Sequence, residues 1–137
     1  MTSTENNNSL AQTIDKLQFN TDGLIPTIAQ DFESCEVLMM AWMNRDAVIE
    51  TLSTGRVCYY SRSRQKLWRK GETSGQVQTL KNFRIDCDAD TVLLLVEQNG
   101  VACHTGRRSC FFEELSADGS AKIIADVIKD PKELYRK

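Results

Sequence analysis

Three of the five cysteines in this chain of 137 residues have positions that could serve metal chemistry. Cys103 and Cys110 flank a short segment that contains Gly106, so the chain can fold back and bring both sulfurs to one point. Cys87 lies upstream, directly after a strand-like segment. Cysteine thiolate is a preferred ligand of zinc in proteins. The chain has no Cys-x-x-Cys pair, which argues against a zinc finger or ribbon.

The number of available ligands indicates what kind of metal site this would be. A structural zinc site usually has four protein ligands, whereas a catalytic site keeps one position for water. No fourth ligand accompanies the three cysteines, so they fit the catalytic type. Spacing alone leaves ordinary buried thiols as the alternative interpretation. Cys35 and Cys58 lie in apolar surroundings, and for these two we expect small core residues.

His104 is the only histidine in the chain and directly follows Cys103. In extended chain, neighbouring side chains point in opposite directions, so the imidazole would not bind the same ion as its neighbour. An imidazole close to a metal site is suited to proton transfer. His104 is therefore the candidate catalytic residue, and a surface histidine without a role is the alternative.

A carboxylate occurs at every second position from Asp86 through Asp88 to Asp90. If this stretch is extended, the three carboxylates share one face and Cys87 takes the other. Neighbouring carboxylates repel one another unless a hard cation lies among them, and Mg²⁺ is the natural candidate. A solvated polar turn is the alternative. A calcium loop is excluded because Thr91 stands where its sharp turn needs glycine.

The segment 61–71 carries five basic residues and no acidic one, and a small polar turn follows it. Guanidinium groups, hydroxyls and backbone amides of such a turn suit a phosphate group. A solvated loop is the alternative. The candidate substrate- and phosphate-binding residues are Arg62, Ser63, Arg64, Trp68, Lys70, Gly71, Glu72, Thr73, Ser74 and Gly75.

Charge and hydropathy exclude several classes of function. The net charge of −2 argues against attraction of the whole protein to nucleic acid or to an anionic membrane. No apolar run approaches the roughly 20 residues of a membrane helix. The polar N-terminus does not have the pattern of a signal peptide, so we expect a cytoplasmic protein whose cysteines are thiols or metal ligands.

The pattern of elements predicts one α+β domain with a largely antiparallel sheet and a few short helices. Residues 1–9 are expected to form a flexible tail and residues 10–137 the domain. We expect Pro26 on an edge strand and Asn99-Gly100 in a hairpin turn. Strands are predicted over 24–30, 36–43, 57–60, 76–85, 91–96 and 111–115, and helices over 9–19, from Asn44 to about Ser53, and from Pro131. Because run 36–43 is continuously apolar, we expect its strand to be buried. Segment 121–128 is open between helix and strand.

Taken together, these segments resemble the phosphoribosyl-AMP cyclohydrolases, a family of enzymes in histidine biosynthesis. Each piece is short, but their combination in this order is specific and spans about residues 23–115. The matching pieces are residues 38–44, 61–64, 67–75, 86–90 and 103–110.

The resemblance implies a zinc-dependent hydrolase that also uses magnesium. Its substrate would be N1-(5-phosphoribosyl)-AMP, a small nucleotide whose adenine ring is opened at the N1–C6 bond. The implied zinc ligands are Cys87, Cys103 and Cys110, and the implied magnesium ligands are Asp86, Asp88 and Asp90. It also implies an intertwined homodimer with zinc ligands from both subunits, which would explain the remote position of Cys87. No nucleic acid or membrane partner is expected.

Two details of the sequence bear on this resemblance. Some relatives carry a fused pyrophosphohydrolase, but this chain ends at Lys137, so we expect a monofunctional protein. Gln76 stands where asparagine is more usual, which leaves its contact with substrate open.

Two other classes of function are weighed against the cyclohydrolase. A zinc nucleobase deaminase needs His-x-Glu and Pro-Cys-x-x-Cys segments, and the chain has neither. A zinc-containing nucleic-acid-binding module would use the basic segment, have a closed metal site and bind with a steep dependence on salt.

Overall fold

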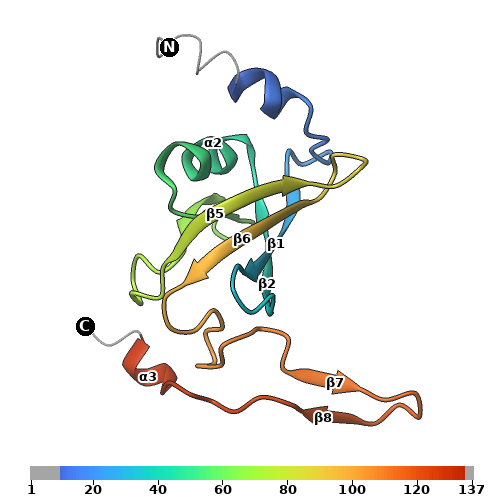
Figure 1. The fold of residues 1–137 in the computed structure, drawn as a ribbon, viewed down its shortest axis with the longest axis vertical. Coiled ribbons are helices and arrows are strands. Elements are labelled where there is room, and N and C mark those ends of the chain that lie inside the picture. Colours follow the sequence, from blue (N-terminus) through green and yellow to red (C-terminus); the bar gives the residue numbers. More distant parts are fainter. Residues whose placement is uncertain (1–9, 135–137) are drawn as a thin grey trace.

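A four-stranded sheet forms the centre of the fold in the computed structural model, which describes residues 10–134 (Figure 1). The strands lie in the order β2-β1-β6-β5. β1 pairs with β6 in parallel, and the two outer pairs are antiparallel. This confirms an α+β domain with a largely antiparallel sheet. The sheet strands are β1 (Ile25–Asp31), β2 (Val37–Met43), β5 (Gln78–Ile85) and β6 (Val92–Gln98).

Helix α2 (Arg45–Thr54) begins and ends as the sequence predicts. Asn44 Oδ1 accepts a hydrogen bond of 2.9 Å from the backbone N–H of Ala47, which satisfies one of the free donors of the first turn. Gly55 ends the helix in the left-handed conformation, with φ 77°. The helix contacts β2, β3 and β5 and closes one side of the core.

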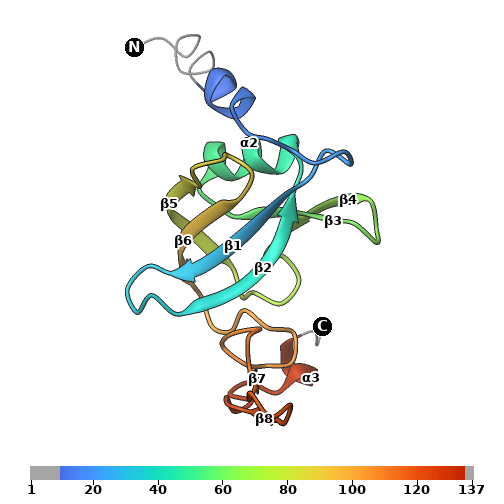
Figure 2. The same cartoon turned by 90° about the vertical axis from the view of Figure 1, so that its right-hand side faces the viewer.

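Two hairpins project from the sheet. The first joins β3 (Cys58–Ser61) to β4 (Lys66–Arg69), and the second joins β7 (Glu113–Leu115) to β8 (Ala121–Ile123). Figures 1 and 2 show β7 and β8 extending well away from the sheet. The short helix α3 (Pro131–Leu134) follows, and residues 10–15 are also helical. No helix within residues 10–134 is long and apolar enough to cross a membrane.

A network of hydrogen bonds between buried side chains crosses the apolar core. Tyr59 Oη donates to Gln78 Oε1 at 2.6 Å, and Gln78 Nε2 donates to Gln98 Oε1 at 2.8 Å. Gln98 Nε2 in turn donates to the carbonyl of Asn99 at 3.0 Å. Buried polar groups that are all hydrogen-bonded specify one arrangement of the core. This network therefore fixes the direction in which the chain leaves β6.

Two turn and edge predictions are wrong. Pro26 lies in β1, which is an interior strand of the sheet. The proline is tolerated there because the parallel ladder with β6 begins only at Thr27 and needs no N–H from residue 26. Asn99-Gly100 does turn, but it leads out of β6 into an irregular loop. The hairpin partner of β6 is β5, and their connection is the turn at 86–91.

Two expectations about burial also need correction. Run 36–43 suggested a buried strand, but β2 is an edge strand of this chain, and Val37 and Met40 are about two-fifths exposed. Cys58 is a core residue as expected, whereas Cys35 is exposed. Cys35 has φ 65° in the β1–β2 turn, which holds its side chain outside the core. The tail expected over residues 1–9 lies outside the described part of the chain.

Removal of the α2 cap should lower stability without altering the sheet. We expect Asn44→Ala to reduce the free energy of unfolding by about 1 kcal/mol, because the N–H of Ala47 loses its acceptor. Urea denaturation followed by circular dichroism measures the change. Asn44→Asp, which keeps an acceptor oxygen, should stay within about 0.5 kcal/mol of the unmodified chain. Equal loss in both variants would show that the cap is not what Asn44 contributes.

Candidate active site

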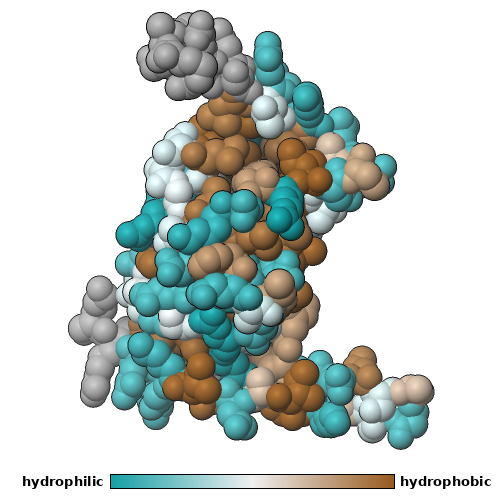
Figure 3. All heavy atoms as spheres, in the orientation of Figure 1, coloured by the Kyte–Doolittle hydropathy of each residue, from teal (hydrophilic) through white to brown (hydrophobic). Residues whose placement is uncertain are grey.

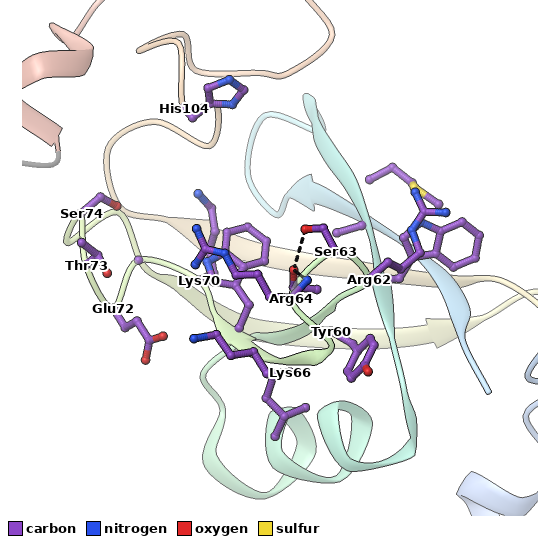
Figure 4. Close-up of a pocket in the computed structure, with 17 residues that line it drawn as sticks. Tyr60, Arg62, Ser63, Arg64, Lys66, Lys70, Glu72, Thr73, Ser74 and His104 are labelled. Atoms are coloured by element: carbon purple, nitrogen blue, oxygen red, sulfur yellow. Dashed lines mark hydrogen bonds between the residues drawn. The ribbon is translucent and has the colours of Figure 1, made fainter. Parts of the chain in front are cut away.

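A pocket of about 1140 Å³ opens between β2, the β3–β4 hairpin, the turn after β4, and the loop that carries His104 (Figure 4). Most residues predicted to bind substrate line it. Gly75 does not, because it ends the turn and its N–H bonds to the carbonyl of Gly71. The predicted residues in the wall are Arg62, Ser63, Arg64, Trp68, Lys70, Gly71, Glu72, Thr73, Ser74 and His104.

Sequence reasoning missed part of the wall. No strand is predicted from the sequence within segment 61–71, but Lys66–Arg69 forms β4, which pairs with β3. The signal was present, because a short polar turn separates the β-prone run 57–60 from Leu67 and Trp68. The wall residues that were missed are Met40, Ala41 and Trp42 on β2, Tyr60 and Ser61 on β3, and Lys66 and Leu67 on β4.

The hairpin turn presents cations to the pocket. The backbone N–H of Arg64 donates to Ser61 Oγ at 3.2 Å, which holds the turn closed. The guanidinium of Arg62 lies 4.9 Å from the centre of the Trp42 ring, within range of a cation–π interaction. Glu72 is the only carboxylate among the lining residues. The wall thus carries an excess of positive charge that favours an anionic ligand.

Cys103 and Cys110 come together at the rim of this pocket because the chain between them folds back. The N–H of Cys103 donates to the carbonyl of Arg107 at 3.1 Å, and the N–H of Cys110 donates to the carbonyl of Leu38 on β2 at 2.7 Å. Although Cys110 as a residue is exposed, burial around its thiol and, to a lesser degree, the neighbouring Cys103 together raise its pKa to about 12. Two adjacent thiols in this setting fit a soft metal ion that would replace their protons.

Gly106 and the C-terminal segment close the loop from the other side. Gly106 has φ 88°, and its carbonyl accepts hydrogen bonds from the N–H groups of Ile128 and Lys129 at 2.9 and 3.1 Å. Arg107 Nε donates to the carbonyl of Ala125 at 2.9 Å. A side chain at position 106 would overlap the carbonyl oxygen of Lys129. Glycine is required here both for its backbone angle and for the close approach of the second segment.

His104 is exposed and lines the pocket, whereas Cys103 next to it is buried. The two side chains diverge as the sequence suggested, although this stretch is a turn and not extended chain. Figure 4 shows His104 on its loop, across the pocket from Arg64 and Lys70. This position is compatible with proton transfer to or from a bound molecule.

Cys87 lies at the other end of the sheet from the thiol pair. It belongs to the β5–β6 turn, and β6 then runs the length of the sheet before the loop that carries Cys103 (Figure 1). Seven residues of strand separate the two ends by on the order of 20 Å. The three cysteine sulfurs do not form a cluster within this chain. One chain therefore supplies two of the three expected zinc ligands to one point.

The three aspartates do converge, but not by strand alternation. The N–H of Asp90 donates to Asp86 Oδ1 at 3.0 Å, and Ala89 has φ 58°, so the stretch is a tight turn. Oxygen atoms of Asp86, Asp88 and Asp90 lie within 4.8 Å of one another. The pKa of Asp90 is raised, first by its hydrogen bond with Asp86 and also by both neighbouring carboxylates. Three exposed carboxylates in this arrangement fit a hard cation.

Gln76 has a structural role. Its Oε1 accepts from the N–H of Val101 at 2.9 Å, and its Nε2 donates to the carbonyl of Ser74 at 3.1 Å. The side chain is buried, does not line the pocket, and occupies space left free by Gly100. The glutamine thus joins the turn after β4 to the chain that leaves β6, away from the pocket.

The fold and this site define an α+β protein with a cationic pocket beside a thiol pair. A family model described as phosphoribosyl-AMP cyclohydrolase matches residues 39–112. The chain therefore belongs to the phosphoribosyl-AMP cyclohydrolase family, as the resemblance of its motifs suggested. The comparisons do not favour the alternative of a nucleic-acid-binding module.

Several curated relatives bear the same name, phosphoribosyl-AMP cyclohydrolase. The relative from Alcanivorax borkumensis is 63% identical over 129 residues, which is 94% of this chain and 90% of that protein. The relative from Paramagnetospirillum magneticum is 61% identical over 93% of this chain and 96% of its own length. That from Alkalilimnicola ehrlichii is 64% identical over 88% of this chain and 84% of its own length.

The close approach at Gly106 generates a prediction with a matched control. Gly106→Ala should reduce the free energy of unfolding by about 3 kcal/mol or more, because left-handed strain adds to a steric overlap with Lys129. Gly23 has a similar φ of 77° but open space around it, so Gly23→Ala should cost only about 1 kcal/mol. Urea denaturation measures both. Equal costs would show that the C-terminal segment does not clamp the loop.

Proposed function

We propose that this protein hydrolyses the N1–C6 bond of the adenine ring in N1-(5-phosphoribosyl)-AMP, a step of L-histidine biosynthesis. The observation that carries the proposal is a pocket with an excess of cations that meets a thiol pair and a lone imidazole at one rim. The relatives named above bear the name of this activity. An absorbance assay with the purified protein and this nucleotide tests it, and absence of turnover in the metal-loaded protein would overturn it.

The size and charge of the pocket suit a nucleotide with two phosphates. Its volume of about 1140 Å³ exceeds the usual range for small ligands, which is roughly 300–1000 Å³. Arg62 and Arg64 project from the hairpin turn, and Thr73 and Ser74 lie on the opposite side of the pocket (Figure 4). We propose that these two groups of residues bind the two phosphates, since forked guanidinium groups and hydroxyls are effective phosphate donors.

We propose zinc at Cys103 and Cys110, with Cys87 of a second subunit as the third ligand. When bound, zinc would supply activation of a water molecule for attack. The residues of this chain hold the purine so that its C6 faces that water. The ring substituent at N1 makes C6 electron-poor. His104 accepts the proton of the attacking water and returns a proton to N1 as the N1–C6 bond breaks.

We further propose a homodimer, because the site is incomplete in one chain. The two most exposed large apolar side chains within residues 10–134, Leu115 and Ile128, are on the β7–β8 hairpin and the segment after it, which form an arm that extends from the body of the molecule (Figure 3). Burial of such an arm against a second copy would remove apolar surface from water. The exposed apolar residues of the arm are Leu115, Ile123, Ile124, Val127 and Ile128.

The remaining cofactor and compartment follow from the same residues. We propose that Asp86, Asp88 and Asp90 bind Mg²⁺, since their oxygens converge on one point of the surface and magnesium prefers carboxylate ligands. We also propose that the protein acts in the cytoplasm, where free thiols are maintained; all five cysteines are free.

Mixed dimers test the shared zinc site. When all chains carry the same substitution, Cys87→Ala and Cys110→Ala should each abolish both turnover and zinc binding. In a dimer that contains one chain of each kind, one of two sites regains all three cysteines, so turnover should return to about half of that of the unmodified dimer. The mixed dimer is isolated by two different affinity tags and assayed by absorbance. Cys35→Ala, at an exposed turn, serves as the control and should keep full turnover.

The opposite outcome is equally clear. If all three ligands came from one subunit, both sites of the mixed dimer would remain damaged and no turnover would return. If both single variants stayed active, zinc at these cysteines would be excluded as the centre of the reaction.

Arg64 should contribute to binding more than to chemistry. We expect Arg64→Ala to raise KM about tenfold or more and to leave kcat within about threefold, because a phosphate distant from C6 is held equally in the ground and transition states. Steady-state kinetics measures both constants. Arg84→Ala removes an exposed arginine that does not line the pocket and should leave both constants unchanged. A fall in kcat alone for Arg64→Ala would contradict the assignment.

A further inference from the structure

Lys70 combines a charge with burial to a degree that is unusual for lysine. Only 9% of the residue is exposed. Its Nζ donates to the carbonyl of Ala102 at 2.8 Å and lies 5.7 Å from the centre of the Trp68 ring. Burial of a charge is costly unless a partner of opposite charge compensates it. The groups around the ammonium therefore indicate what it serves.

The acidic side chains that act on this ammonium are the thiols of Cys110 and Cys103, which would become negative on losing their protons to a metal ion. Within residues 10–134, no carboxylate forms an ion pair with Lys70. Burial lowers its pKa, and the charges of Cys110 and Cys103 oppose that shift. The hydrogen bond to Ala102 directs the ammonium to the residue that immediately precedes Cys103. Lys70 thus lines the pocket and also contacts the loop that carries the thiol pair.

The other pocket cations differ from Lys70 in this respect. Arg64 and Lys66 are exposed, and no carboxylate of the described residues holds either of them. These two are available to an incoming phosphate. The ammonium of Lys70 is already bonded to a carbonyl and largely removed from solvent. Figure 4 shows Lys70 between Arg64 and the turn that carries Thr73.

We infer that Lys70 is a positioning residue of the metal site and not a phosphate ligand. Its ammonium, fixed by the Ala102 carbonyl, offsets the negative charge that two metal-bound thiolates bring to the rim of the pocket. It also ties β4 to the loop of Cys103 and so keeps the thiol pair next to the substrate pocket. This inference rests on the zinc site proposed above. Groups that support metal ligands in this way typically contribute 10- to 100-fold to metal affinity.

Three substitutions separate charge from hydrogen bonding and packing. Lys70→Met removes both charge and donor, Lys70→Gln keeps an amide donor without charge, and Lys70→Arg keeps the charge. Zinc affinity of the purified dimer is measured by competition with a chromophoric chelator. We expect about 10- to 100-fold weaker zinc binding in the Met and Gln variants, and affinity within about threefold of the unmodified chain in the Arg variant.

Lys66→Met is the matched control, because it removes an exposed lysine from the same pocket. It should leave zinc affinity unchanged, which excludes a general effect of pocket charge. At saturating zinc, Lys70→Gln should have a KM within about threefold of the unmodified protein, whereas a phosphate ligand would show a large rise in KM. Circular dichroism confirms that each variant is folded, and Lys70→Gln and Lys70→Arg decide the matter if Lys70→Met is not.

Two results would overturn the inference. If Lys70→Gln bound zinc as tightly as the unmodified chain, the charge of Lys70 would have no effect on the metal site, and its role would be limited to the hydrogen bond with Ala102. If Lys70→Gln raised KM and left zinc affinity unchanged, Lys70 would be a phosphate ligand instead. If the unmodified chain itself bound no zinc, the metal site proposed above would fail, which is a different outcome from either of these.

Discussion

The fold-back of residues 102–110 is the constraint on which the site depends. This loop has little regular structure of its own, and hydrogen bonds from three neighbouring segments hold it. The N–H of Cys110 bonds to the carbonyl of Leu38 on β2, Gly106 bonds to the C-terminal segment, and Lys70 bonds to Ala102. Because these contacts come from distant parts of the sequence, the position of the thiol pair is a property of the whole fold.

The same contacts place the thiols beside the cationic pocket. Chain direction at the end of β6 is set by the buried amides of Gln78 and Gln98. Lys70 stands at the junction, since it lines the pocket while its ammonium faces the thiol loop. The cationic pocket and the zinc site proposed at the thiol pair would thus share one buried charge.

The sequence was informative where local chemistry decides structure. Asn44 and Gly55 cap the two ends of α2, and such capping depends only on residues close in the sequence. The convergence of Cys103 and Cys110 was also predictable, because Gly106 lies between them. What failed depends on pairing between distant segments. The parallel ladder with β6 places β1 inside the sheet, and this determines the surroundings of Pro26. The roles of Gln76 and Lys70 depend likewise on contacts with residues 101 and 102.

X-ray absorption at the zinc edge of the purified, catalytically active protein tests the central claim most directly. We expect three sulfur neighbours at about 2.3 Å and one lighter neighbour, because two thiols of one chain and one of another leave a position for water. Four sulfur neighbours would mean a closed structural site. A shell of oxygen or nitrogen without sulfur would mean that the metal lies elsewhere and that Cys103 and Cys110 do not hold it.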